Sequence, residues 1–121
     1  MDTTREKGSA AEEIAASYLK KKGYEILDQN WYNQHKELDI VARKDGIVAI
    51  VEVKSLTKNY LREPFQSVNR NKQRLLISAA NAYIRRHNIN EDVRFDIISI
   101  IMDGKEPQIE HMENAFYPTV R

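Results

Sequence analysis

Residues 40–53 constrain the fold of this chain more than any other stretch. They form two apolar runs on either side of Asp45-Gly46, and Asp-Gly between apolar runs is the strongest short signal for a β-hairpin. Residues 48–51 are apolar without alternation, which is typical of a strand buried on both faces. The sequence therefore predicts a hairpin whose second strand lies in the centre of a sheet.

Charged side chains gather on one face of the predicted hairpin, because side chains alternate between faces with period two. If Lys44 and Ile47 flank a two-residue turn, Asp39 lies opposite Glu52. The same register sets Glu37 opposite Lys54. The charged face is then Glu37, Asp39, Glu52 and Lys54, and the apolar face is Leu38, Ile40, Val51 and Val53.

Two carboxylates on opposite residues of paired strands have Cβ atoms about 4.5–5.5 Å apart, and like charges at that distance are destabilising. Such a pair either raises one pKa or is held by a cation. Mg²⁺ is commonly bound by one or two carboxylates, and a nearby lysine can orient a water or offset charge on a phosphate. The pattern allows two interpretations, a half-exposed hairpin with a polar face or a divalent-metal site. Charges at the end of a central strand favour the metal site.

The composition fits a single soluble domain over residues 1–121, with residues 1–7 frayed at the start. A net charge of +1 excludes binding to nucleic acid by bulk charge, so any such surface must be a local patch. The absence of cysteine excludes thiolate zinc sites and cysteine nucleophiles. There is no apolar run near ~20 residues and no leader, so we expect a cytoplasmic protein with no membrane partner.

Apolar spacing predicts the other elements of the chain. Two segments show helical periodicity, three more have the composition of strands, and two aromatics in the tail suggest a segment docked onto the domain. The predicted helices are 9–22 and 65–87, the strands are 24–31, 93–102 and 108–112, and the docked tail is 114–117. With the hairpin, this order predicts an α/β domain with a mixed sheet.

Two charged residues lie at or within the apolar stripes of these helices. Glu12 lies at the edge of the first stripe, whereas Glu13 falls on the solvent side. Glu12 either extends to water or turns toward the sheet. Lys72 lies in line with the apolar residues of the second helix, so it either extends past the helix edge or reaches an acidic site. Arg70 adds positive charge to the same helix.

Several short patterns occur here in an order that resembles a known family. Glu37-Leu38-Asp39 followed by Glu52-Val53-Lys54 resembles the metal-site core of the PD-(D/E)XK nuclease superfamily. The full set is similar to the small bacterial YraN-like family. It comprises Gly8-x-x-Ala11-Glu12-x-x-Ala15, Tyr18-Leu19, Gly23-Tyr24-x-Ile26-Leu27, Asn30-Trp31, the two core patterns, Pro64, Val68-x-x-x-Lys72, Arg94-Phe95-Asp96 and Asn114-Ala115-Phe116.

The resemblance implies a restriction-endonuclease-like fold, akin to archaeal Holliday-junction resolvases, with an αβββαβ core. Its mixed central sheet would be flanked by two main helices. It also implies a metal-dependent endonuclease, in which Asp39 and Glu52 bind Mg²⁺ or Mn²⁺, Lys54 is the catalytic lysine and Glu12 completes the site. Two positions depart from the family pattern: Lys36 and Arg62 stand where glycines are common.

The expected activity is hydrolysis of DNA phosphodiester bonds, with branched or otherwise structured DNA among the open substrates. A junction cutter would need a homodimer for paired cuts. One alternative is a non-catalytic nucleic-acid-binding module that retains the nuclease fold. Another is an interaction protein that binds no nucleic acid. The candidate substrate-binding residues are Lys36, Lys58, Arg62, Arg70 and Lys72.

Overall fold

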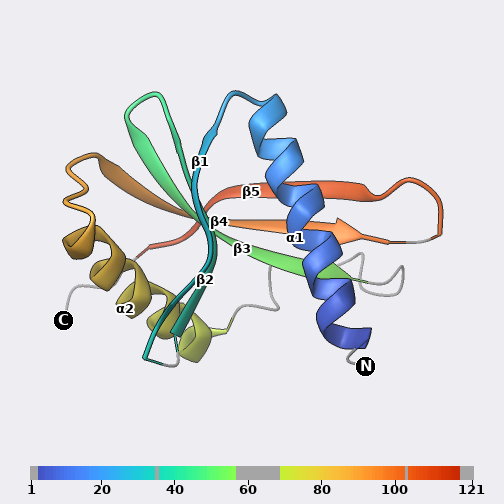
Figure 1. Cartoon of the computed structure of the whole chain (residues 1–121), viewed down its shortest axis with the longest axis horizontal. Helices are drawn as coiled ribbons and strands as arrows, with labels where there is room; N and C mark the ends of the chain where they lie inside the picture. The colour runs from blue at the N-terminus through green and yellow to red at the C-terminus, as the bar shows by residue number, and fades with distance from the viewer. Residues whose placement is uncertain (1–2, 35, 57–68, 103, 118–121) are drawn as a thin grey trace.

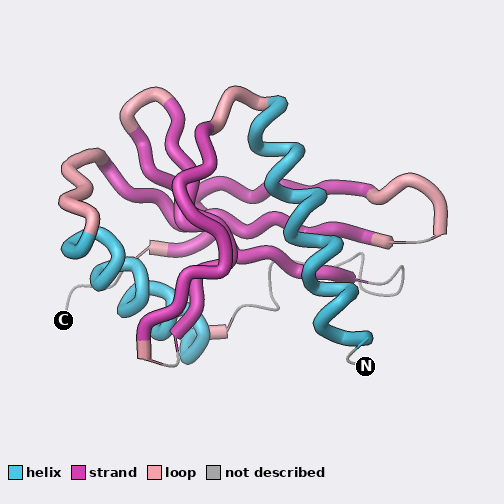
Figure 2. The backbone as a smooth tube through the Cα atoms, in the orientation of Figure 1, coloured by secondary structure: helices cyan, strands magenta, loops and turns pink. Residues whose placement is uncertain are grey.

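The computed structural model describes residues 3–34, 36–56, 69–102 and 104–117, and these residues form a five-stranded sheet with two helices (Figure 1). The elements are α1 (Thr3–Lys21), β1 (Glu25–Asn33), β2 (Lys36–Lys44), β3 (Ile47–Leu56), α2 (Arg70–Arg86), β4 (Asp92–Ile101) and β5 (Gln108–Phe116). The strands follow one another across the sheet in chain order, with β3 and β4 parallel and the other neighbours antiparallel. Figure 2 shows the strands gathered together and the two helices apart from each other. The predicted α/β class is confirmed, and the arrangement is that of a restriction-endonuclease-like core.

The β2–β3 hairpin forms in the predicted register. Lys44 pairs with Ile47, and the ladder continues to the pair of Ile40 and Val51. Asp45 and Gly46 between them have φ angles of 54° and 77°. Positive φ at both turn residues matches a type I′ turn, whose twist suits the flanking strands.

We expect Gly46→Ala to lower the free energy of unfolding by about 1 kcal/mol, because a Cβ disfavours positive φ. No atom of the described structure lies within 4 Å of a Cβ built at this position, so backbone strain accounts for the whole cost. Urea unfolding measures the loss. Gly46→Asn is the control, since asparagine tolerates positive φ and should lose less. Equal stability of Gly46→Ala and the wild type would contradict the turn geometry.

Strand β3 separates two hydrophobic cores, and its residues 48–51 are buried on both faces as predicted. Val48 and Ile50 pack in the core beneath α2, whereas Ala49 and Val51 pack in the core beneath α1. The two helices thus cover opposite faces of the sheet, which confirms a central position for β3. In the part of the chain that the structure describes, neither helix is long and apolar enough to cross a membrane.

Several element boundaries differ from the predicted ones. Helix α1 begins at Thr3, so residues 3–7, expected to be frayed, are helical; Arg5, Glu6 and Lys7 are good helix formers and nothing before Gly8 interrupts them. Of the predicted helix 65–87, residues 65–68 lie outside the described residues, and α2 begins at Arg70 after the N-cap Asn69.

The end of the chain is also organised differently from the prediction. Strand β5 continues to Phe116, so most of the expected docking segment is part of the sheet. Phe116 stacks on Phe95 with ring centroids 5.1 Å apart, whereas Tyr117 is 69% exposed. Leu75, placed in the apolar stripe of α2 by its periodicity, is 50% exposed. The stripe that packs on the sheet is Leu76, Ala79, Ala80 and Tyr83.

A buried ionic network joins β4, β5 and α1. Asp96 is 1% exposed, and its carboxylate accepts two hydrogen bonds from Arg94 at 2.9 Å and one from His111 Nε2 at 2.7 Å. His111 Nδ1 in turn lies 3.0 Å from the hydroxyl of Tyr18 on α1. Arg94 also donates to the hydroxyl of Tyr24 at 2.6 Å. The network ties α1 and Tyr24, the residue before β1, to strands β4 and β5.

Candidate metal centre

The candidate site lies where β2 diverges from β3. The ladder between these strands ends at the pair of Ile40 and Val51, and Asp39, which precedes Ile40 in β2, is the first residue beyond it. In the neighbouring strand β1, Gln29 pairs with Ile40 and Trp31 with Leu38, and Asn30 between them has a φ of 53°. Ile40 packs in the core beneath α1, but Leu38 packs in the core beneath α2. The prediction that Leu38 and Ile40 share a face is therefore wrong, because the alternation of β2 is interrupted at Asp39.

This interruption gives the Asp39 side chain a backbone partner. Its Oδ2 accepts a hydrogen bond from the N–H of Val53 at 2.9 Å. The carboxylate thus bonds to β3 directly, where a regular ladder would use a backbone carbonyl. In the described strands no ladder pair joins Asp39 to Glu52, so the predicted direct cross-strand pair is replaced by this side-chain contact.

Three carboxylates come together at this point. Glu12 from α1, Glu37 and Asp39 each offer a ligand atom, and these atoms all lie within 4.8 Å of one another. Glu12 turns toward the sheet and Glu13 is exposed, as the helical wheel predicted. The side chain of Asn30 forms a hydrogen bond with Glu12. We call Glu12, Glu37 and Asp39 the acidic cluster.

The acidic cluster contains more negative charge than its surroundings stabilise. Burial raises the pKa of Asp39 to about 8, with further contributions from Glu52, Glu12 and Glu37; the hydrogen bond from Val53 opposes this. Burial also raises the pKa of Glu12, with Glu37 and Glu52 adding to the effect against the hydrogen bond with Asn30. Such a site takes up either a proton or a cation. Its oxygen donors are the ligands that hard divalent cations prefer, so these residues are compatible with a site for such a cation.

Glu52 lies beside the acidic cluster but is paired with lysines. It is 5% exposed, and its Oε2 lies 3.7 Å from Lys54 Nζ and 3.6 Å from Lys72 Nζ. Glu52 is not one of the three carboxylates of the acidic cluster. Its negative charge is nevertheless the largest cause, after burial, of the raised pKa of Asp39. The sequence interpretation missed Glu37, because the regular register paired it with Lys54. Its spacing of two residues from Asp39 was the available signal.

The predicted substrate-binding residues have different positions. Lys36 donates a hydrogen bond to Ser78 of α2 at 2.7 Å. Arg70 is exposed at the start of α2. Lys72 reaches the carboxylate of Glu52, which was one of its two alternatives, and its side chain remains 45% exposed. Lys58 and Arg62 lie outside the described residues.

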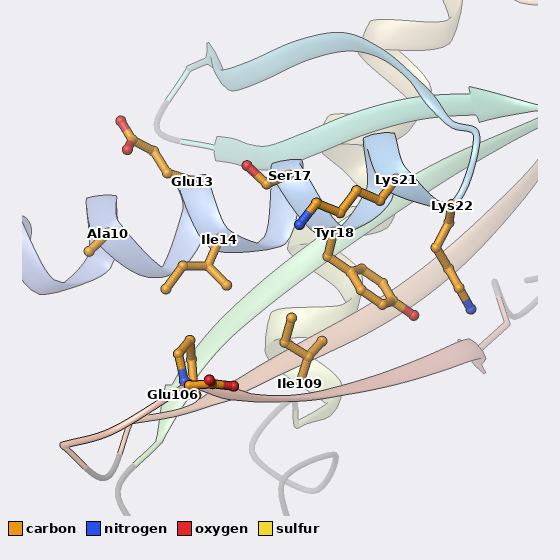
Figure 3. A pocket seen from close by; sticks show the side chains of 10 residues that line it. Ala10, Glu13, Ile14, Ser17, Tyr18, Lys21, Lys22, Glu106 and Ile109 are labelled. Atoms are coloured by element: carbon orange, nitrogen blue, oxygen red, sulfur yellow. The ribbon is translucent and has the colours of Figure 1, made fainter.

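A separate hollow of about 860 Å³ lies between α1 and the start of β5 (Figure 3). Its apolar lining includes Ile14, Tyr18 and Ile109, with Lys21 and Lys22 at the helix end. None of the predicted site residues lines it. The candidate site is therefore defined by its charged groups and not by this cavity.

Comparison with known proteins gives a consistent family. A model of the group described as Uncharacterised protein family UPF0102 matches residues 11–100. The protein is 41% identical to UPF0102 protein FP2501 of Flavobacterium psychrophilum over 110 residues, which is 91% of this chain and 92% of that protein. It is 43% identical to UPF0102 protein BF0634 of Bacteroides fragilis over 111 residues, 92% of each chain. A UPF0102 protein of Porphyromonas gingivalis is 42% identical over 113 residues, 92% of this chain and 84% of the relative. With a family model over most of its length and relatives this similar, the chain belongs to the UPF0102 (YraN-like) family.

Proposed function

We propose that this protein is a metal-dependent endonuclease that hydrolyses phosphodiester bonds in DNA. The observation that carries the proposal is the partly buried Asp39 carboxyl, which lies among other carboxylates and whose pKa is raised to about 8 by burial and by Glu52, Glu12 and Glu37. A purely structural carboxylate would be expected beside a cation of the protein. Asp39 instead lies within 4.8 Å of two other carboxylates, which favours a site for a bound metal ion.

The acidic cluster would hold the cation, with Glu12, Glu37 and Asp39 as its oxygen donors. Bound there, Mg²⁺ or Mn²⁺ supplies polarisation of a phosphate and a lower pKa for an attacking water. The hydrogen bond from Val53 fixes one oxygen of Asp39, so the carboxylate is already oriented before a ligand arrives.

The lysines beside the acidic cluster supply positive charge that can contact a phosphate. Lys54 and Lys72 reach Glu52 from β3 and from α2, so positive charge flanks the acidic cluster. Lys54 has a side chain 26% exposed, and its ammonium can stabilise negative charge that develops on a phosphate. Arg70, Lys72 and Arg74 are exposed along the start of α2, which provides the local positive patch that a chain of net charge +1 needs to hold DNA.

The pairing of Glu52 with two lysines also favours a second candidate function. A carboxylate that is paired with two lysines is less available to a metal ion, which suits a nucleic-acid-binding module that retains the nuclease fold. Turnover distinguishes this module from the enzyme.

The test is a panel of labelled branched, duplex and single-stranded DNAs incubated with Mg²⁺ or Mn²⁺. We expect cleavage by the wild type and a loss of at least about 100-fold in Asp39→Asn and Glu12→Gln, the scale of removing one group that stabilises transition-state charge. Glu52→Ala tests the lysine-paired carboxylate. Glu13→Gln is the matched control, since Glu13 is the exposed neighbour of Glu12 and should cleave normally. Binding without cleavage would support the binding module, and absence of binding would refute both.

A further inference from the structure

Tyr32 of β1 is the cross-strand partner of Glu37 in β2. Directly opposite residues of an antiparallel pair lie on the same face, with Cβ atoms about 4.5–5.5 Å apart. Since Glu37 belongs to the acidic cluster, the side chain of Tyr32 leaves the backbone beside a member of that cluster. No pattern in the sequence indicated a role for this residue.

The neighbours of Tyr32 hold its backbone but leave its side chain open. Trp31 packs edge-on against Tyr83 of α2 with ring centroids 5.2 Å apart, and its cross-strand partner Leu38 is fully buried on the same side. Tyr32 therefore faces the other side, where α1 and the acidic cluster lie. It is 64% exposed, and within the described ranges it has no hydrogen bond, ion pair or ring contact.

Other large apolar side chains are also exposed, namely Leu75, Met112 and Tyr117. In the described strands, none of them is the ladder partner of a residue of the acidic cluster. An aromatic ring fixed at its backbone and open on its face is suited to stack on a nucleobase, an interaction that every base can make.

We propose that Tyr32 stacks on an unpaired nucleobase of DNA beside the phosphate that the acidic cluster acts on. In a regular duplex the base faces are covered by their neighbours, so this contact selects DNA that has an unpaired or unstacked base at that point. The inference rests on the proposed function and names its substrate class: DNA distorted next to the scissile bond.

The test compares the affinity for two duplexes of equal length, one fully paired and one with a single unpaired 2-aminopurine, in EDTA so that metal-dependent cleavage is absent. We expect the wild type to prefer the bulged duplex, and Tyr32→Ala to reduce that preference by about 5- to 150-fold, the range measured for single base–aromatic stacks. The fluorescence of 2-aminopurine should be quenched by the wild type and not by Tyr32→Ala. Tyr32→Phe should behave as the wild type.

Tyr117→Ala is the matched control, because Tyr117 is equally exposed but follows β5, at the opposite edge of the sheet from β1. It should leave the preference for the bulged duplex unchanged.

Equal preference in Tyr32→Ala and the wild type, with DNA cleaved in Mg²⁺ or Mn²⁺, would overturn the stacking inference and leave the proposed nuclease function intact. A preference that depends on Tyr32 without any cleavage would uphold stacking and refute the nuclease. Absence of DNA binding would overturn both, and an effect of Tyr32 confined to bulged RNA would overturn the assignment to DNA.

Discussion

Asp96→Ala is expected to lower the free energy of unfolding by about 3–5 kcal/mol, the scale of removing one partner from a buried ion pair. The carboxylate is fully buried and holds Arg94, His111 and the backbone N–H of Asn114. Without it, the guanidinium of Arg94 and the ring of His111, with side chains 14% and 6% exposed, remain buried but lose the carboxylate that pairs with both. Urea unfolding at neutral pH measures the loss.

Glu113→Ala is the matched control for this substitution. Glu113 also approaches Arg94, at 3.8 Å, but its side chain is 57% exposed, and exposed ion pairs contribute little. We expect a change within about 0.5 kcal/mol. A loss below 1 kcal/mol in Asp96→Ala would show that the network does not hold β4, β5 and α1 together.

The pH dependence of the free energy of unfolding provides a second test of the contribution of Asp96. Burial alone would raise the pKa of Asp96, but the hydrogen bonds from His111 and Arg94 outweigh it and hold the pKa below the usual 3.8. A carboxyl with a lowered folded pKa contributes stability above its unfolded pKa and loses it as the pH falls through the folded value. Wild type should therefore lose this contribution below about pH 4, whereas Asp96→Ala has none to lose.

The hairpin could be predicted from the sequence because its information is local. Asp45-Gly46 allows the turn, and the turn sets the register of every pair down to Ile40 and Val51. The burial of residues 48–51 follows from their composition alone. The orientation of Glu12 could be predicted for the same reason, since the period of a helix assigns each side chain to one face.

The geometry around Asp39 could not be predicted in the same way. Period two holds only while the ladder is regular, and it fails at Asp39, where the ladder to β3 has ended and Asn30 of the neighbouring strand β1 adopts positive φ. As a result, Leu38 packs in the core beneath α2. Glu37 lies close to Asp39, whereas the regular register had placed it opposite Lys54. The pairing of Asp96 with His111 also escaped prediction, because it depends on how β5 lies against β4 and not on any local pattern.

Asp39→Asn is expected to stabilise the metal-free protein at pH 8, on the order of 2 kcal/mol, and to abolish its response to metal. The folded pKa of Asp39, about 8, is far above its unfolded value of 3.8. A raised folded pKa contributes stability that is fully present below the unfolded pKa and is lost as the pH rises through the folded value. The free energy of unfolding of the wild type should therefore fall between about pH 4 and pH 8. The variant has no carboxyl at this position, so it should not show this fall. At about 1.4 kcal/mol per pKa unit, the whole shift would correspond to several kcal/mol. Solvent screens part of this at the partly exposed Asp39, and the weaker hydrogen bond from Val53 to the amide removes about 1 kcal/mol, so we expect a gain on the order of 2 kcal/mol to remain.

Thermal melts of both proteins across this pH range, with and without Mg²⁺ or Mn²⁺, test the expectation. A cation that binds only the folded site raises the melting temperature, and it competes with the proton on Asp39, so the rise in the wild type should be larger at pH 8 than at pH 6. Glu13→Gln, which removes an exposed carboxylate from α1, should match the wild type in both respects. If Asp39 were a structural partner of a lysine, the signs would reverse: Asp39→Asn would melt lower at pH 8, and neither protein would respond to metal. That result would remove the metal site and leave the lysine-flanked Glu52 as the feature of a binding module.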